Sequence, residues 1–212
     1  MCNLKLTVFP KGVLRFSELT YLNLSDNQIS EIPGSIGKLI NLKYLNLSKN
    51  QLSKLPESIW SLAKLEYLDV SNNQLFEIPE SIGGLSKLKY LDVSNNQLSE
   101  IPESIGGLSK LKYLYIMKNQ FSELPESIGS LTKLDSLDIS SNQLSELPHT
   151  VKQLIDLREL NISRNQFSTI PECTYSLENL IYFGFSSQNT GVKLSLPPGI
   201  FKYLDSSGAC DW

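Results

Sequence analysis

The sequence predicts an α/β fold: a right-handed, curved solenoid with a parallel sheet on its concave side and short turns or 3-10 helices on its convex side. Two observations predict it. Asparagine and proline each recur every 23 residues through most of the 212-residue chain. Each unit also contains a short stretch in which apolar and polar residues alternate, as in a β-strand. Internal repeats of about this length are typical of proteins built from stacked coils.

The composition supports this fold and excludes several others. Leucine supplies 37 residues and alanine only two, which argues against a helical bundle because alanine is the best helix former. The apolar content of 41% is enough for a core and excludes wholesale disorder. A net charge of -3 argues against a nucleic-acid binder. Since no stretch approaches 18 consecutive apolar residues, we expect no membrane insertion.

Each part of the repeat has a predicted structural role. In the segment 42–47, Leu45 and Leu47 alternate with polar residues, so this segment is the predicted strand. The repeated asparagine follows the strand, where a buried carboxamide can bond backbone groups of its own and adjacent coils. Proline then enforces an extended segment, and Ile-Gly-x-Leu supplies a tight turn. The asparagines are Asn27, Asn50, Asn73, Asn96, Asn119, Asn142 and Asn165, and the prolines are Pro33, Pro56, Pro79, Pro102, Pro125, Pro148 and Pro171.

The repeat pattern resembles a known family. Each unit reads LxxLxLxxNQL, then xxIP or xxLP, then ExIGxLxx with variations. The chain thereby resembles leucine-rich repeat proteins, specifically the 23-residue variety with an LPxxIGxL second half. It is similar to bacterial proteins of this family, notably those of spirochaetes such as Leptospira, and to the Ras-linked group of intracellular proteins. The resemblance covers about residues 4–204 and implies the architecture, but it does not identify a partner.

The chain is predicted to form one domain over 1–212. Residues 1–18 form an incomplete first coil, 19–187 the 23-residue repeats, and 188–212 an irregular last coil with a C-terminal cap. Terminal units are expected to be atypical because they must shield the end of the stack. We interpret Ile200, Tyr203, Leu204 and Trp212 as the apolar closing segment.

Few residues could perform chemistry. His149 is the one histidine, and its neighbours in register are Glu126 and Glu172, so this column is the one candidate for a divalent metal site. We interpret His149 instead as a solvated substitution and predict no metal, no cofactor and no enzyme activity. Cys2, Cys173 and Cys210 are too few for a disulfide framework. Whether Cys173 and Cys210 pair stays open.

Charged residues also form columns. Two glutamate columns are Glu57, Glu80, Glu103, Glu126 and Glu77, Glu100, Glu123, Glu146, and a lysine column is Lys64, Lys87, Lys110, Lys133. We interpret these columns as a solvated flank rather than as an interaction surface or a cation site. Trp60, in a turn where glycine is commonest, is expected to be an exposed aromatic that packs along its own flank.

Strand residues that alternate with the core leucines should face solvent on the concave side. The first such column is Tyr21, Tyr44, Tyr67, Tyr90, Tyr113, Ser136, Glu159 and Tyr182; the second is Asn23, Asn46, Asp69, Asp92, Tyr115, Asp138 and Asn161; the third is Ser25, Ser48, Ser71, Ser94, Met117, Ser140 and Ser163. The tyrosines either form a binding surface, since tyrosine is enriched in interface hot spots, or support the sheet by stacking. Both interpretations can hold together.

One coil changes all of these columns. Tyr115 replaces Asn or Asp, Met117 replaces Ser, and Lys118 follows, after which the tyrosine column stops at Ser136. Drift in a single repeat could cause this, or the coil could form an apolar ridge beside a recess floored by Ser136. We choose the second interpretation as the predicted contact site. Its residues are Tyr90, Tyr113, Tyr115, Met117, Lys118, Asp138 and Glu159.

The predicted function is non-catalytic binding of a protein or peptide on the concave face, by a monomer and in the role of a bacterial host-interaction protein. Two alternatives are an accessory recognition fragment of a larger effector enzyme and a glycan-binding sensor. The compartment is open, with a bacterial secreted or cell-surface location favoured over the cytoplasm. The N-glycosylation sequons at Asn23, Asn46 and Asn161 would place glycans on the concave face, which argues against a eukaryotic secreted protein.

Overall fold

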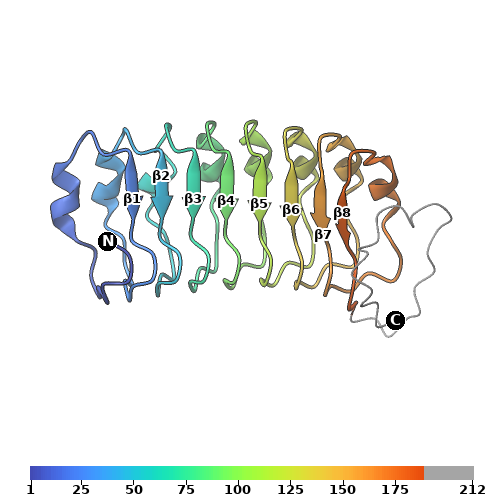
Figure 1. Cartoon of the computed structure of the whole chain (residues 1–212), viewed down its shortest axis with the longest axis horizontal. Coiled ribbons are helices and arrows are strands. Elements are labelled where there is room, and N and C mark those ends of the chain that lie inside the picture. The colour runs from blue at the N-terminus through green and yellow to red at the C-terminus, as the bar shows by residue number, and fades with distance from the viewer. Residues whose placement is uncertain (189–212) are drawn as a thin grey trace.

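A computed structural model describes residues 1–188 of the chain. In that range the chain forms one parallel sheet in which each strand pairs with the next along the sequence (Figure 1). The strands are β1 Tyr21–Asn23, β2 Tyr44–Asn46, β3 Tyr67–Asp69, β4 Tyr90–Asp92, β5 Tyr113–Tyr115, β6 Ser136–Asp138, β7 Glu159–Asn161 and β8 Tyr182–Gly184. Every pairing joins equivalent positions of the repeat, so the columns read from the sequence are physical columns.

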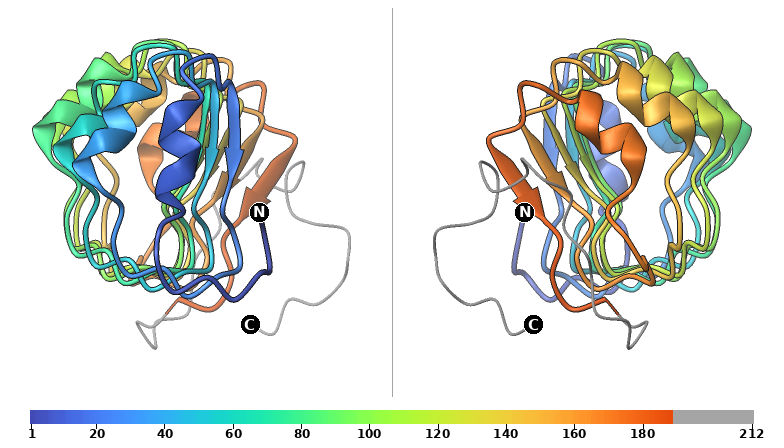
Figure 2. Two further views of the ribbon diagram at one scale, coloured as in Figure 1. Left: turned by 90° about the vertical axis from the view of Figure 1, so that its left-hand side faces the viewer. Right: turned by 90° about the vertical axis from the view of Figure 1, so that its right-hand side faces the viewer.

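Short 3-10 helices lie on the opposite side of each coil from the sheet, as the end views in Figure 2 show. They are η1 Lys11–Arg15, η2 Gly34–Lys38, η3 Glu57–Ile59, η4 Glu80–Gly84, η5 Glu103–Gly107, η6 Glu126–Ser130, η7 His149–Gln153 and η8 Glu172–Ser176. Each begins directly after a proline, which fixes the entry of the chain into the turn. The predicted solenoid with 3-10 turns on one side and a parallel sheet on the other is confirmed.

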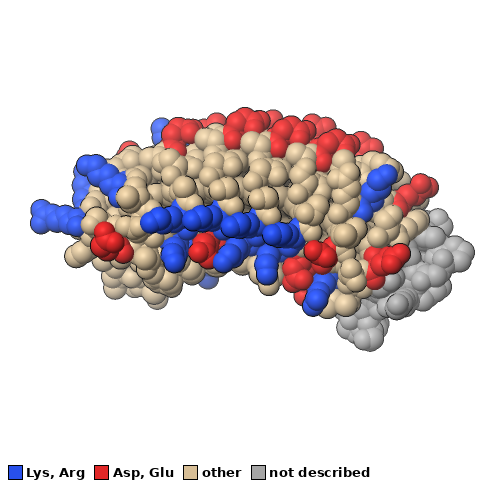
Figure 3. All heavy atoms as spheres, turned by 90° about the horizontal axis from the view of Figure 1, so that it is seen from above, with Lys and Arg blue, Asp and Glu red and all other residues tan. Residues whose placement is uncertain are grey.

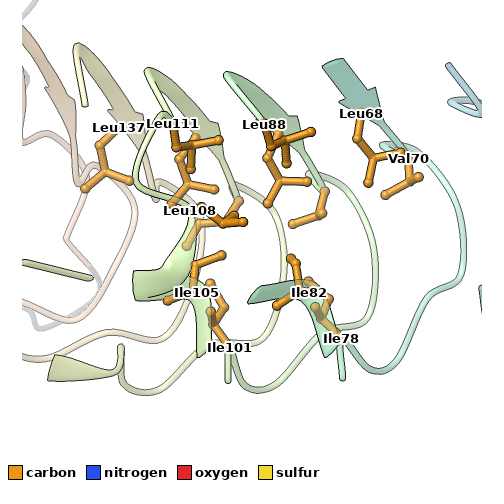
Figure 4. Packing of buried hydrophobic residues seen from close by; sticks show 14 of the residues in the cluster. Leu68, Val70, Ile78, Ile82, Leu88, Ile101, Ile105, Leu108, Leu111 and Leu137 are labelled. Carbon is orange, nitrogen blue, oxygen red and sulfur yellow. The ribbon is translucent and has the colours of Figure 1, made fainter. Parts of the chain in front are cut away.

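The core fills the space between the sheet and the 3-10 helices. Figure 4 shows Leu68 and Leu88 on the strand side facing Ile82 and Ile105 on the helix side. The strand leucines Leu45, Leu68, Leu114 and Leu160 are fully buried. Since no coil could bury this surface alone, the stack of coils forms one continuous hydrophobic core.

The asparagine column satisfies backbone groups inside the turns. The Asn50 side chain accepts a hydrogen bond from the Ile29 N–H at 3.0 Å and donates to the carbonyls of Leu24, Leu47 and Ser48. It therefore links its own coil to the preceding one. Gln188 continues this role in the last described coil, where it accepts from the N–H groups of Asn165 and Phe167. The structural role predicted for the column is confirmed.

Trp60 departs from its prediction. Its side chain is only 4% exposed and belongs to the hydrophobic core, so the expectation of an exposed aromatic was wrong. Trp60 follows η3, which is three residues long where its neighbours η2 and η4 have five. The indole therefore packs inward at a position where glycine is the commonest residue of the repeat. Residues 189–212 lie outside the described residues, and with them Cys210 and the predicted closing segment of Ile200, Tyr203, Leu204 and Trp212.

Candidate functional site

The concave face, meaning the solvent side of the sheet, carries a ladder of tyrosine rings. Tyr21, Tyr44, Tyr67 and Tyr90 stack with ring centroids 4.1–4.2 Å apart and nearly parallel planes. In-register strands hold equivalent residues about 4.8 Å apart, so successive rings are brought into van der Waals contact. The supporting role of the tyrosines, which the sequence had left open, is thus present in the first four strands.

The ladder breaks at β5. Tyr113 lies 6.3 Å from Tyr90 with its ring tilted by 46°, and the Tyr115 ring meets Tyr90 edge-on at 5.5 Å. Tyr115 pairs with Asp92 on one side and Asp138 on the other, so an aromatic ring stands between two carboxylates. The substitution in this coil therefore changes the geometry of the concave face as well as its composition.

The residues around the break are positioned by β5, β6 and β7. Tyr113, Tyr115, Met117 and Asp138 are half-buried, whereas Lys118 and Glu159 are exposed. Ser136 pairs with Tyr113 and is only 4% exposed. At β6 a buried serine therefore replaces the tyrosine ring of the preceding strands. None of the seven predicted contact residues belongs to the hydrophobic core. The sheet register brings them to one part of the concave face.

The phenols of Tyr90 and Tyr115 are neutral. Burial raises the pKa of Tyr90, with the Asp92 carboxylate adding to the effect. Burial also raises the pKa of Tyr115, against a hydrogen bond with Ser136 that lowers it, and the Glu159 carboxylate raises it further. These rings offer uncharged amphipathic surface.

The third predicted column is largely inside the fold. Ser48, Ser71, Ser94, Ser140 and Ser163 are all buried, so the expectation that this column faces solvent was wrong. These serines lie where the strand bends into the asparagine turn; the Ser94 N–H, for example, donates to the Asp92 carboxylate at 2.9 Å. Met117, the residue that replaces serine in β5's coil, is half-buried and adds apolar surface at this edge.

Asp92 makes stability depend on pH. Burial raises the pKa of its carboxyl, with hydrogen bonds from Ser94 opposing and Asp69 adding to the rise. The folded chain therefore holds this proton more tightly than the unfolded chain, and the carboxyl's contribution to stability falls as pH rises through the folded-state pKa. Asparagine should be tolerated here, since Asn46 and Asn161 accept the equivalent backbone hydrogen bonds in their own coils.

We expect Asp92→Asn to raise the melting temperature at pH 7, with the gain shrinking as the pH falls through the raised folded-state pKa and lost below about 4, the usual carboxyl range. Thermal melts from pH 3 to pH 8 measure this. The control is Asp26→Asn, at an exposed position where Asn72 and Asn95 are the equivalents; it should show no pH-dependent gain. A lower melting temperature for Asp92→Asn at pH 7 would contradict the assignment.

The His149 column shows no metal site. No group of three or more His, Cys, Asp or Glu side chains among residues 1–188 is arranged to hold an ion. The His149 Nε2 lies 2.6 Å from the Lys152 Nζ, a cation that competes with any metal at that nitrogen.

Burial raises the pKa of the Cys173 thiol, which disfavours the nucleophilic thiolate.

A second concavity was not predicted. The two glutamate columns flank a groove of about 880 Å³ whose floor is formed by the Ile-Pro and Leu-Pro pairs of four coils. The groove is also lined by His149 and by seven glutamates: Glu77, Glu80, Glu100, Glu103, Glu123, Glu126 and Glu146. The sequence contained a signal for this groove, since each proline stands between two repeated glutamates.

Among residues 1–188, none of the helices has the length and apolar character that a bilayer-spanning segment requires.

Comparisons with known families agree with this geometry. Residues 17–75 match the family described as leucine rich repeat, and residues 57–120 and 103–195 match the one described as leucine-rich repeat region. The chain belongs to the leucine-rich repeat family. A search of curated proteins found no match for it.

Solved structures of other leucine-rich repeat proteins have the same fold. A leucine-rich repeat protein of Leptospira interrogans is 33% identical with a TM-score of 0.73, over 92% of this chain and 54% of that one. The ectodomain of the Arabidopsis thaliana receptor kinase GASSHO1/SCHENGEN3, solved in complex with CASPARIAN STRIP INTEGRITY FACTOR 2, is 33% identical with a TM-score of 0.77, over 85% and 22%. An internalin of Listeria monocytogenes is 26% identical with a TM-score of 0.75, over 85% and 52%. This leucine-rich repeat chain thus spans about half the length of the two bacterial proteins.

Proposed function

We propose that the chain is a non-catalytic module that binds a protein or peptide on its concave face. The contact site consists of Tyr90, Tyr113, Tyr115, Met117, Lys118, Asp138 and Glu159. The observation that carries the proposal is the break in the tyrosine ladder, where the stacking of the first four strands gives way to tilted and edge-on rings. A ring that is not covered by an in-register neighbour has apolar surface for a partner to bury.

The chemistry of the site suits a protein partner. Tyrosine contributes a large contact area at low cost in conformational entropy, and methionine adapts to irregular surfaces. Lys118, Asp138 and Glu159 place charges of both signs around the apolar centre, which favours a specific orientation of the partner. The Arabidopsis ectodomain solved with a bound factor is a precedent for binding by this fold.

The proposal extends to the setting of the protein. The similarity to Leptospira and Listeria proteins supports a bacterial chain, and the similarity to a receptor ectodomain supports a position outside the cytoplasm. In that setting the partner would be a host protein, bound by a monomer of this chain.

Site-directed cross-linking tests which face is used. A photoreactive phenylalanine analogue placed at Tyr113 should cross-link a bound partner. The same analogue at Tyr175, on η8 and 47% exposed, should not. Both positions carry a tyrosine, so the substitution is matched. Cross-links from Tyr175 alone would place the partner on the 3-10 helices and overturn the proposed site.

A further inference from the structure

The charges of this chain are separated in space although they nearly cancel in sum. The net charge is -3, yet Figure 3 shows a band of Lys and Arg side chains along one edge, with uncharged surface between it and a row of Asp and Glu. We define the cationic edge as the exposed lysines on the loops that lead into the strands. They are Lys43, Lys64, Lys87, Lys89, Lys110, Lys112 and Lys133.

Backbone hydrogen bonds fix the spacing of these lysines. The Glu66 N–H donates to the Lys43 carbonyl, Lys89 to Glu66, and Lys112 to Lys89, all at 2.8–2.9 Å. Residues so linked advance by one strand spacing per coil, about 4.8 Å. Lys64, Lys87, Lys110 and Lys133 form a second row two residues earlier in each coil. The cationic edge is therefore a straight double row along the solenoid, made of ammonium groups except where Glu66 stands between Lys43 and Lys89.

Little negative charge opposes this edge. Glu66 bonds Lys89 at 2.7 Å, and the only other ion pair within residues 1–188 joins Arg158 to Asp135. The pKa of Glu66 is lowered, chiefly by Lys89 and further by Lys43 and Lys87, so one carboxylate serves several lysines. Exposed charges further apart than about 8 Å are largely screened at physiological salt. The edge therefore presents its own positive field whatever the net charge of the chain.

We propose that the cationic edge binds a linear sulfated polysaccharide. Its straight double row suits an extended chain with regularly spaced fixed charges. Beside the second row, directly before Lys87, Lys110 and Lys133, come the exposed residues Ser86, Ser109 and Thr132, whose hydroxyls can bond sulfate or sugar oxygens.

Two other classes of polyanion suit the edge less well. In the central coils the apolar residues between the lysines, Leu88 and Leu111, are fully buried. The exposed Ile40 and Ile155 stand only at the two ends of the edge, so its central coils lack the apolar anchors by which peripheral proteins enter membranes. The exposed side chains beside the lysines at Ser86, Ser109 and Thr132 carry hydroxyls rather than the aromatic rings on which single-stranded nucleic acids stack. This site is independent of the proposed partner site on the concave face.

Titration of the chain with a heparin octasaccharide at 50 and 150 mM NaCl tests the proposal. Binding should weaken steeply with salt, because lysine contacts to a polyanion release counterions. Lys87→Glu/Lys110→Glu should weaken binding at least about tenfold. The matched control, Lys54→Glu/Lys152→Glu, makes the same change in net charge at exposed lysines outside the cationic edge and should stay within about twofold of the parent.

Four results would overturn the proposal, the last of which concerns an unsulfated fragment. The first is no binding of the octasaccharide at 50 mM NaCl, and the second is equal loss in the two double variants. The third is binding by single-stranded DNA of the same charge, or by vesicles containing phosphatidylserine, that is tighter than octasaccharide binding. An unsulfated polysaccharide fragment of equal length should bind at least about tenfold more weakly, since it lacks most of the fixed charge; equal binding would remove sulfate as the recognised group.

Discussion

Asn96→Ala is expected to lower the free energy of unfolding by about 1–3 kcal/mol, the cost of leaving buried backbone groups without partners. The Asn96 side chain accepts from the Leu75 N–H at 3.0 Å and donates to the carbonyls of Val70, Val93 and Ser94. Those carbonyls keep other donors; Val70, for example, also accepts from Asn73 at 3.1 Å. The Leu75 N–H has no such alternative among the bonds of the described residues and is the main source of the loss.

Gln97→Ala is the matched control. Gln97 is the next residue, its side chain is exposed, and its backbone N–H, which donates to the Leu75 carbonyl, is untouched by the substitution. It should cost less than about 0.5 kcal/mol. Urea denaturation of both variants measures the difference. Equal shifts would mean that the asparagine column does not carry the coil-to-coil bonding ascribed to it.

The fold could be predicted because the repeat reports the same environment many times. The recurrence of leucine at Leu45, Leu68 and Leu91 identifies a column that points into the core. The recurrence of one asparagine per coil likewise identifies a position with the same structural role in each coil. The sequence could not predict a residue that leaves the pattern. Trp60 is buried because it packs into the core after a shortened 3-10 helix, and a single substitution carries no periodic signal.

The sequence named the residues of the candidate site but predicted the geometry of the concave face only in part. Alternation correctly separated the tyrosine column from the core, but it was extended two residues too far, to serines that are buried where the chain leaves the sheet. The strict two-residue period holds only within strands of three residues. The acidic groove was missed for a related reason. The groove is lined by residues of four successive coils, so its shape depends on how their proline segments lie relative to one another. A pattern within one repeat does not contain that information.

Restoring Tyr115→Asn and Met117→Ser together is expected to weaken partner binding by at least about 30-fold, or roughly 2 kcal/mol. The two changes reinstate the residue types that other coils carry, so the concave face loses the ring that meets Tyr90 edge-on and the apolar edge beside it. Buried apolar surface contributes about 25 cal/mol per Å², and a central aromatic anchor contributes more than its neighbours. The affinity of the cross-linked partner, measured by titration with parent and variant chains, gives the loss.

Folding should be unaffected, since Tyr115 and Met117 are outside the core and Ile116 between them is fully buried. The melting temperature of the double variant should therefore stay close to that of the parent. A control pair at an unbroken coil, Asn23→Asp with Ser25→Ala, alters the same two positions in β1's coil, where both side chains are half-buried, and should leave binding within about twofold of the parent, because rim contacts contribute little. If the Tyr115 and Met117 variant binds its partner as tightly as the parent does, the contact site is elsewhere. If the control pair loses as much affinity as that variant, the whole tyrosine face acts as the binding surface and the break at β5 has no special role.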